Sequence, residues 1–186
     1  MDAAEALLET HNVSDLTIDL VMARTELART NFYRLFEDLD ALLLEILERA
    51  KYELETRVTA WSEGTGPVEE ALGIAVRGVV TAYAHHGVVF RAIGEGAAQA
   101  PRLRAAWRGF VDDFTEATIR RIERDVRAGY TRVENAGETA CALVLMTEAY
   151  MRRAVEDGDL DPERAAATLV PIWTRALTER DVAGTP

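Results

Sequence analysis

Four polar side chains in the segment 29–34 have the chemistry to recognise DNA bases. They are Arg29, Thr30, Asn31 and Arg34. Arginine can donate two hydrogen bonds to guanine, and asparagine can bond adenine in the same two-point way. If the segment is a helix that lies in the major groove, these side chains can contact base edges. The alternative is structural, with the arginines as solvated surface residues and Asn31 as a local helix cap.

The elements that must position these side chains are helices. Apolar residues recur with helical periodicity, and no alternating run indicates a strand. Thr17 precedes an apolar run and is predicted to cap a helix, while Gly87, Gly129 and Gly158 are predicted to end helices. Pro171 is predicted to kink or restart the last helix. We therefore predict an all-α protein of about nine helices, at residues 3–10, 18 onward, 28–34, 37–61, 67–85, 88–99, 101–127, 136–156 and 161 onward.

Three short motifs accompany the recognition segment. They are Leu16-Thr17 followed by Val21, then Phe32-Tyr33-Arg34 followed by Phe36, then Asp40-Ala41-Leu42-Leu43. Two short helices, a tight turn and a long helix behind them make a helix-turn-helix. Over residues 3–47 these motifs resemble the DNA-binding signature of the TetR family of transcription regulators.

The resemblance implies a division of labour along the chain. Residues 1–46 would be the helix-turn-helix DNA-binding domain, and residues 47–186 a helical domain for ligand binding and dimerisation. The resemblance also implies that Thr17 and Tyr33 bind backbone phosphates of double-stranded operator DNA. Phe32 and Phe36 are predicted to belong to the core rather than to the contact surface.

Several positions near the expected DNA surface depart from the family pattern. Glu26 stands where the turn usually has glycine, Ala28 where a serine usually caps the recognition helix, and Leu39 where a lysine usually grips phosphate. The first 50 residues hold eleven acidic and four basic side chains, a net charge of −7, and the whole chain carries −11. DNA binding normally requires a basic surface, so we expect binding that is weak, unusually salt-sensitive or lost.

The segment 90–129, with Pro-Arg-Leu-Arg-Ala-Ala-Trp-Arg-Gly-Phe at 101–110, resembles the C-terminal region of the EthR-like branch of that family. The resemblance implies a deep apolar pocket for a small lipophilic effector. For each aromatic residue the alternative is plain core packing. Thr147 stands out because a buried hydroxyl requires a hydrogen-bond partner. The predicted lining residues are Tyr83, Phe90, Trp107, Phe110, Phe114, Leu143, Met146, Thr147 and Tyr150.

The helix predicted at 136–156 is apolar almost all round between Ala140 and Met151, so it should be covered on more than one side. Together with the last helix it could form a four-helix seam between two copies, which is how the family dimerises. The predicted homodimer residues are Ala140, Val144, Met151, Ala165, Leu169, Ile172, Trp173 and Ala176. Two-fold symmetry would then place two recognition helices on one operator.

We therefore predict a DNA-binding transcriptional regulator, a repressor whose operator affinity is controlled by a small lipophilic ligand. The alternative is a related dimer that binds ligands or proteins and has weakened or lost its DNA binding. Enzyme activity is not expected, because the sequence lacks phosphate-binding and dinucleotide-binding motifs and Cys141 has no evident base. No catalytic residue, cofactor or metal site is predicted.

The two adjacent histidines, His85 and His86, make a poor metal pair because neighbours on a helix point in different directions. Charge at a helix C-terminus is the expected reason for them. A single cysteine excludes an intramolecular disulfide. No signal peptide or membrane span is predicted, so we expect a cytoplasmic protein.

Overall fold

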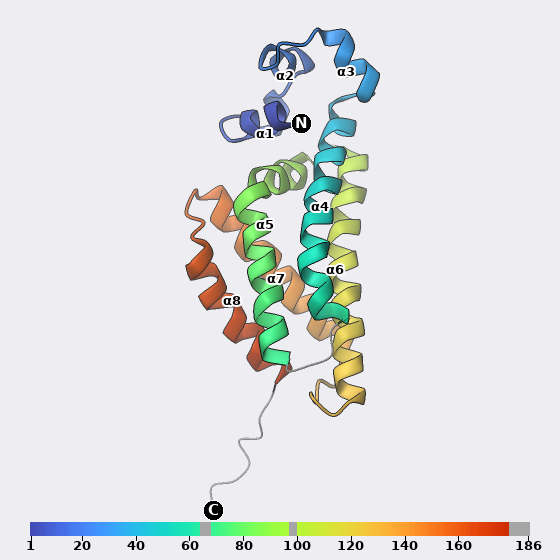
Figure 1. The fold of residues 1–186 in the computed structure, drawn as a ribbon, viewed down its shortest axis with the longest axis vertical. Helices are drawn as coiled ribbons and strands as arrows, with labels where there is room; N and C mark the ends of the chain where they lie inside the picture. Colours follow the sequence, from blue (N-terminus) through green and yellow to red (C-terminus); the bar gives the residue numbers. More distant parts are fainter. Residues whose placement is uncertain (64–67, 97–99, 179–186) are drawn as a thin grey trace, which may run out of the picture.

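The computed structural model describes residues 1–63, 68–96 and 100–178, and within these ranges the chain is helical with no strand. The predicted all-α class is confirmed. The elements are α1 (Asp2–Leu8), the 3₁₀ helix η1 (Val13–Asp15), α2 (Ile18–Ala23), α3 (Arg29–Leu35), α4 (Leu39–Glu63), α5 (Val68–Gly96), α6 (Pro101–Arg127), α7 (Ala136–Glu156) and α8 (Pro162–Leu177). Figure 1 shows α1–α3 as a head at one end, while α4 runs from that head into a body formed with α5–α8.

Local capping sets several helix ends, as predicted. The Thr17 side chain accepts a hydrogen bond from the Leu20 amide at 3.1 Å, and α2 begins there. Gly129 and Gly158 follow α6 and α7 with φ of 76° and 66°, values at which glycine has no Cβ to clash. The helix α8 continues through Pro171, so the chain does not restart a helix there, which was one of the two predicted outcomes.

The prediction that a helix ends at Gly87 is wrong. α5 continues through it to Gly96, so the helix predicted at 88–99 is the second part of α5. The ribbon of α5 changes direction toward that end (Figure 1). The explanation given for the histidines also fails, because His86 lies inside α5. Its ring is buried, with Nε2 at 3.1 Å from Glu53 Oε2 and Nδ1 at 3.6 Å from Glu5 Oε1.

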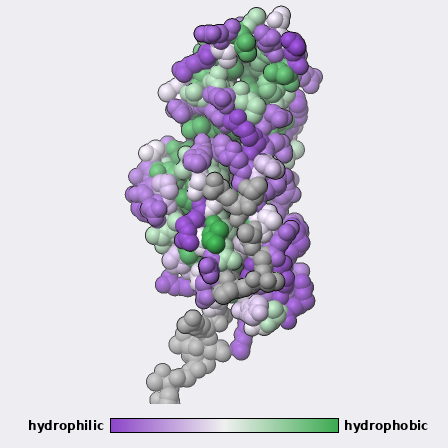
Figure 2. All heavy atoms as spheres, viewed as in Figure 1, coloured by the Kyte–Doolittle hydropathy of each residue, from purple (hydrophilic) through white to green (hydrophobic). Residues whose placement is uncertain are grey.

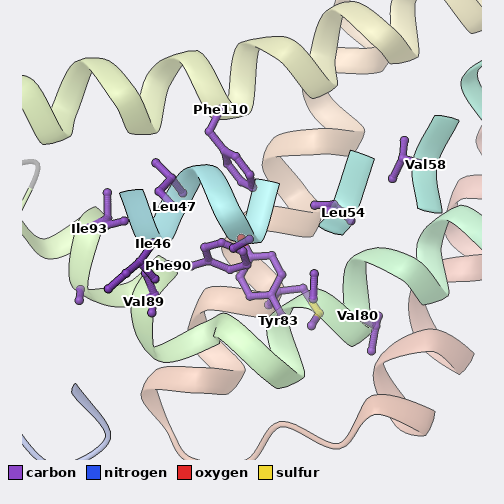
Figure 3. Close-up of a cluster of buried hydrophobic side chains, with 14 of the residues drawn as sticks. Ile46, Leu47, Leu54, Val58, Val80, Tyr83, Val89, Phe90, Ile93 and Phe110 are labelled. Atoms are coloured by element: carbon purple, nitrogen blue, oxygen red, sulfur yellow. The ribbon is translucent and has the colours of Figure 1, made fainter. Parts of the chain in front are cut away.

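One hydrophobic core extends from the head into the body. In the head, Phe32 is buried as predicted and packs against the half-buried Phe36, with the ring centroids 5.4 Å apart and the rings tilted. In the body, Tyr83 and Phe90 of α5 lie side by side, and Phe110 points toward them from α6 (Figure 3). The predicted domain boundary at residue 46 falls inside α4, so the helix itself joins the two parts.

The C-terminal end of α4 is tied to α6 by two arginines. Arg121 donates to the carbonyl of Trp61, and Arg124 donates to that of Ser62. Both carbonyls belong to the last described turn of α4. Arg121 is buried and is neutralised by Asp125, one turn further along α6, at 2.7 Å.

Among the described helices, none combines the length and hydrophobicity that crossing a bilayer requires.

Gly87 lies where α5 and α7 approach closely, which explains a glycine inside a helix. A Cβ at this position would lie 2.6 Å from Cγ2 of Val155. The valine cannot easily turn away, because β-branched side chains have one strongly preferred rotamer in a helix. The glycine is therefore a packing requirement and not a helix end.

We expect Gly87→Ala to destabilise the protein. Overpacking costs about 1–3 kcal/mol, and the gain in helix propensity, about 0.5–1 kcal/mol, offsets only part of that cost. Gly109 of α6 is the matched control, because a Cβ there meets nothing within 4 Å. Gly109→Ala should therefore stabilise. Urea unfolding measures both, and a Gly87→Ala variant as stable as the parent would contradict the packing argument.

Candidate DNA-contact surface and ligand cavity

The turn between α2 and α3 is closed by Thr25. Its hydroxyl donates to the Met22 carbonyl at 2.9 Å and accepts from the Leu27 amide at 3.3 Å. No described non-glycine residue has positive φ. Glu26 therefore does not adopt a left-handed backbone, so replacing the usual glycine with glutamate introduces no strain of that kind in this turn. Ala28 precedes α3 without any side-chain cap, as its residue type dictates.

The six predicted DNA-contacting residues all lie at the surface of the head. Thr17, Arg29, Thr30, Tyr33 and Arg34 are exposed, and Asn31 is half-buried on the first turn of α3. The Asn31 side chain does not cap α3, which leaves the structural alternative for this residue unsupported. Exposed side chains on α3 are a requirement for reading a groove, and this helix meets it.

Arg29 is already engaged within the head. Its Nη1 donates to Asp19 Oδ1 at 2.7 Å and its Nη2 to the Tyr33 hydroxyl at 3.0 Å, while its guanidinium lies 5.6 Å from the Tyr33 ring centroid. These contacts raise the pKa of Arg29, first through Tyr33 and then through Asp19. Tyr33 accepts in this pair, so its own O–H remains available as a donor.

Two exposed leucines, Leu27 shortly before α3 and Leu35 at its last position, were missed as surface features. Leu27 is 59% exposed and Leu35 is 75% exposed. The face of the head seen in Figure 2 mixes hydrophobic with hydrophilic side chains. Sequence patterning assigns leucines in a short helix to the core, and only the packed structure shows which ones remain outside it. The surface around Arg29 is therefore acidic and partly apolar.

The body holds an apolar cavity of about 70 Å³ between α4, α5, α6, α7 and α8. Four of the nine predicted residues line it, namely Tyr83, Phe110, Phe114 and Thr147. Val144 and Trp173, predicted for the dimer seam, line it as well. The lining residues that sequence reasoning missed are Leu54, Val58, Trp61, Leu72, Ala75, Val76, Val79, Val111, Thr118 and Glu148.

The other predicted pocket residues lie elsewhere. Phe90 and Trp107 pack against Phe110, with ring centroids 5.4 Å from it in each case, and so they support the wall rather than form it. Leu143 is buried, and Met146 and Tyr150 are half-buried, none of them in the lining. Of the predicted aromatic residues on α5 and α6, Tyr83, Phe110 and Phe114 therefore reach the cavity, whereas Phe90 and Trp107 lie behind its wall.

Several polar groups face this apolar space. The Trp173 indole donates to the Thr147 hydroxyl at 2.8 Å, which supplies the partner that a buried hydroxyl requires. The indole Nε1 of Trp61 is buried and has no acceptor among the described residues. The Tyr83 hydroxyl makes no hydrogen bond to the described residues, and burial, together with the nearby charge of Glu148, raises its pKa strongly.

The residues predicted for the dimer seam divide into two groups. Ala140, Met151, Ala165, Leu169 and Trp173 are buried in the core of the protomer, so in this structure they present no surface to a second copy. Ile172 is 38% exposed, and Val144 and Ala176 are half-buried. Leu145, which the prediction omitted, is 49% exposed on α7. The outer apolar surface of α7 and α8 is therefore narrower than predicted.

Known proteins resemble both parts of this chain. Residues 73–178 match the family described as transcriptional regulator EthR, C-terminal domain. The HTH-type transcriptional regulator EthR of Mycolicibacterium smegmatis is 25% identical over 182 residues, which cover 94% of this chain and 82% of that protein.

Solved structures share the fold at lower identity. A TetR-family transcriptional regulator from Syntrophomonas wolfei gives a TM-score of 0.80 at 15% identity, covering 98% of this chain and 95% of that one. SmeT, the repressor of the Stenotrophomonas maltophilia multidrug efflux pump SmeDEF, gives 0.75 at 19% identity, covering 100% and 91%. This chain therefore belongs to the TetR family of transcriptional regulators, with a C-terminal domain of the EthR type.

Proposed function

We propose that this regulator is a cytoplasmic repressor that binds operator DNA as a dimer and releases it when a small lipophilic ligand enters the body cavity. One observation carries the proposal. Leu54, Val58 and Trp61 of α4 form part of the cavity wall, and α4 begins at Leu39, directly after the recognition helix α3. A ligand that displaces this wall therefore acts on the helix that holds the head.

The cavity must enlarge to hold a ligand. Ligand sites typically measure about 300–1,000 Å³, whereas this one has about 70 Å³. A ligand must therefore move wall residues, and it can change DNA affinity only by binding one arrangement better than the other. The buried Trp61 N–H supports a polar contact as well, because an unsatisfied buried donor costs about 1–3 kcal/mol.

The proposed division of the chain follows from the same helix. Residues 1–46 contact DNA through α3, with Thr17 and Tyr33 on phosphates and Arg29, Thr30, Asn31 and Arg34 toward bases. Residues 47–186 bind the ligand and dimerise through α7 and α8, where Leu145 and Ile172 offer exposed apolar side chains. SmeT is described as a repressor, which agrees with repression as the output here.

The acidic head favours a second candidate function, in which the dimer binds ligands or proteins and has lost its operator. A charge of −7 over residues 1–50 opposes the approach of phosphates. The guanidinium of Arg29, which lies beside Tyr33, already forms an ion pair with Asp19. The two candidates differ in a single property, which is measurable.

Titration of the protein against its own upstream intergenic DNA separates the two functions. We expect specific binding at low salt that weakens steeply at moderate salt, because contacts with the phosphates supply most of the favourable free energy of binding. Arg29→Ala and Asn31→Ala should each weaken it by about 1–3 kcal/mol if they contact bases. Arg120→Ala, an exposed arginine of α6 in the body, is the control for charge. Absence of binding even at low salt would establish the second candidate.

Asp19→Asn should strengthen DNA binding, because it releases Arg29 and removes one acidic charge from the contact surface. An exposed ion pair is worth at most about 1 kcal/mol, so the gain should reach up to about fivefold. Fluorescence anisotropy at low salt measures it. Asp112→Asn makes the same change of charge on an exposed part of α6. An equal gain from both variants would show that only net charge matters and that Arg29 plays no special part.

A further inference from the structure

We propose that the cavity takes a lipophilic cation, such as an alkyl or aryl amine, with Glu148 as its counter-ion. The inference rests on the proposed ligand control and specifies the chemical class of the ligand. Among the described residues that line the cavity, Glu148 is the one that carries a charge; the others are apolar, aromatic or hydroxyl-bearing. A buried cation is tolerated only where an opposite charge compensates for its lost hydration.

The group formed by Glu148, Arg152 and Glu156 carries more negative than positive charge. Its Oε1 accepts from Arg152 Nε at 3.0 Å, but the same guanidinium also donates from Nη1 to Glu156 at 2.7 Å. Two carboxylates thus share one guanidinium, and the group carries a net charge of −1. Glu148 Oε2 accepts no hydrogen bond from the described residues. One oxygen of a largely buried carboxylate, with 16% of its side chain exposed, is therefore available to a ligand.

The influence of this carboxylate extends to the cavity wall. Glu148 and Tyr83 both line the cavity, and the charge of Glu148 adds to burial in raising the pKa of the Tyr83 hydroxyl, while the charge of Arg152 acts in the opposite direction. Tyr83 comes from α5 and Glu148 from α7, so the carboxylate is held against the facing helix. A cation placed between them would satisfy Glu148 and leave the neutral phenol as a hydrogen-bond acceptor.

The remaining wall suits a cation because it is aromatic. The cavity is lined by Trp61, Trp173, Phe110 and Phe114 together with Tyr83, and aromatic faces attract cations through the ring quadrupole. The protein already uses this interaction, because the buried Arg121 guanidinium lies 5.8 Å from the Trp61 ring centroid. That guanidinium is neutralised by Asp125 and therefore does not repel a second cation strongly.

An anionic lipid such as a fatty acid fits the cavity less well. Its carboxylate would lie beside Glu148 without a basic residue in the described lining to compensate for the repulsion. The buried N–H of Trp61 and the hydroxyl of Tyr83 could both donate to an anion, but neither donor carries a charge. The net charge of −11 repels anions at longer range as well.

Three probes of equal chain length separate these ligand classes, namely octylamine, octanol and octanoate below their aggregation limits at neutral pH. Trp61 and Trp173 line the cavity, so intrinsic tryptophan fluorescence reports entry of each probe. We expect octylamine to bind about tenfold more tightly than octanol, the order of one desolvated charge contact, and octanoate to bind most weakly. DNA titration in the presence of each probe should show the same order of effect.

Glu148→Gln tests the assigned residue and keeps the size of the side chain. It should reduce the affinity for octylamine to that for octanol while leaving octanol unchanged. Glu138→Gln is the matched control, because it removes a carboxylate of the same helix α7 from an exposed position outside the cavity lining. That variant should retain the tenfold preference for the amine. Thermal unfolding of both variants verifies that each is folded.

The outcomes distinguish the inference from the function on which it rests. Preference for octanoate, equal binding of amine and alcohol, or an undiminished preference in Glu148→Gln would overturn the cation site. If octanol or octanoate binds and weakens DNA binding while octylamine does neither, ligand control stands and only the ligand class is wrong. If none of the three changes the fluorescence or the DNA affinity, both the cation site and lipophilic control are contradicted.

Discussion

Arg121 anchors the helix on which both parts of the molecule depend. It is buried and paired with Asp125, and it donates a hydrogen bond to the carbonyl of Trp61 near the end of α4. A buried pair of this kind contributes little net stability, but loss of one partner leaves a buried charge and costs about 3–5 kcal/mol. The pair therefore acts mainly by fixing position. It holds one end of α4 against α6, so any displacement of the cavity wall must be taken up elsewhere along α4.

The other end of α4 is connected to the head by polar contacts with α1. Arg49 of α4 donates to Glu5 at 2.7 Å, and Arg91 of α5 donates to the Leu8 carbonyl at 2.7 Å. His86 lies between Glu5 and Glu53, and its hydrogen bond lowers the pKa of Glu53. These polar contacts add to the apolar core that runs from the head into the body, so both kinds of interaction hold the joint.

Local features could be predicted from the sequence, and features that depend on distant partners could not. Thr17 caps its own helix, and Gly129 relieves its own backbone, so each is visible in a few adjacent residues. Gly87 resembles a helix end until Val155 is placed against it. In the same way, the hydroxyl of Thr147 was recognised as significant, but its partner Trp173 was assigned to the dimer seam.

The electrostatic cost of an acidic head has a consequence for control by ligand. A repressor with strong phosphate contacts requires a ligand that distinguishes its two arrangements by several kcal/mol. Here the net charge of −7 and the engaged Arg29 leave little affinity to remove. A small difference in ligand affinity between the two arrangements is then sufficient to release operator DNA, because coupling of about 1–3 kcal/mol already changes affinity by 5–150-fold. A narrow cavity with one carboxylate can supply a difference of that size.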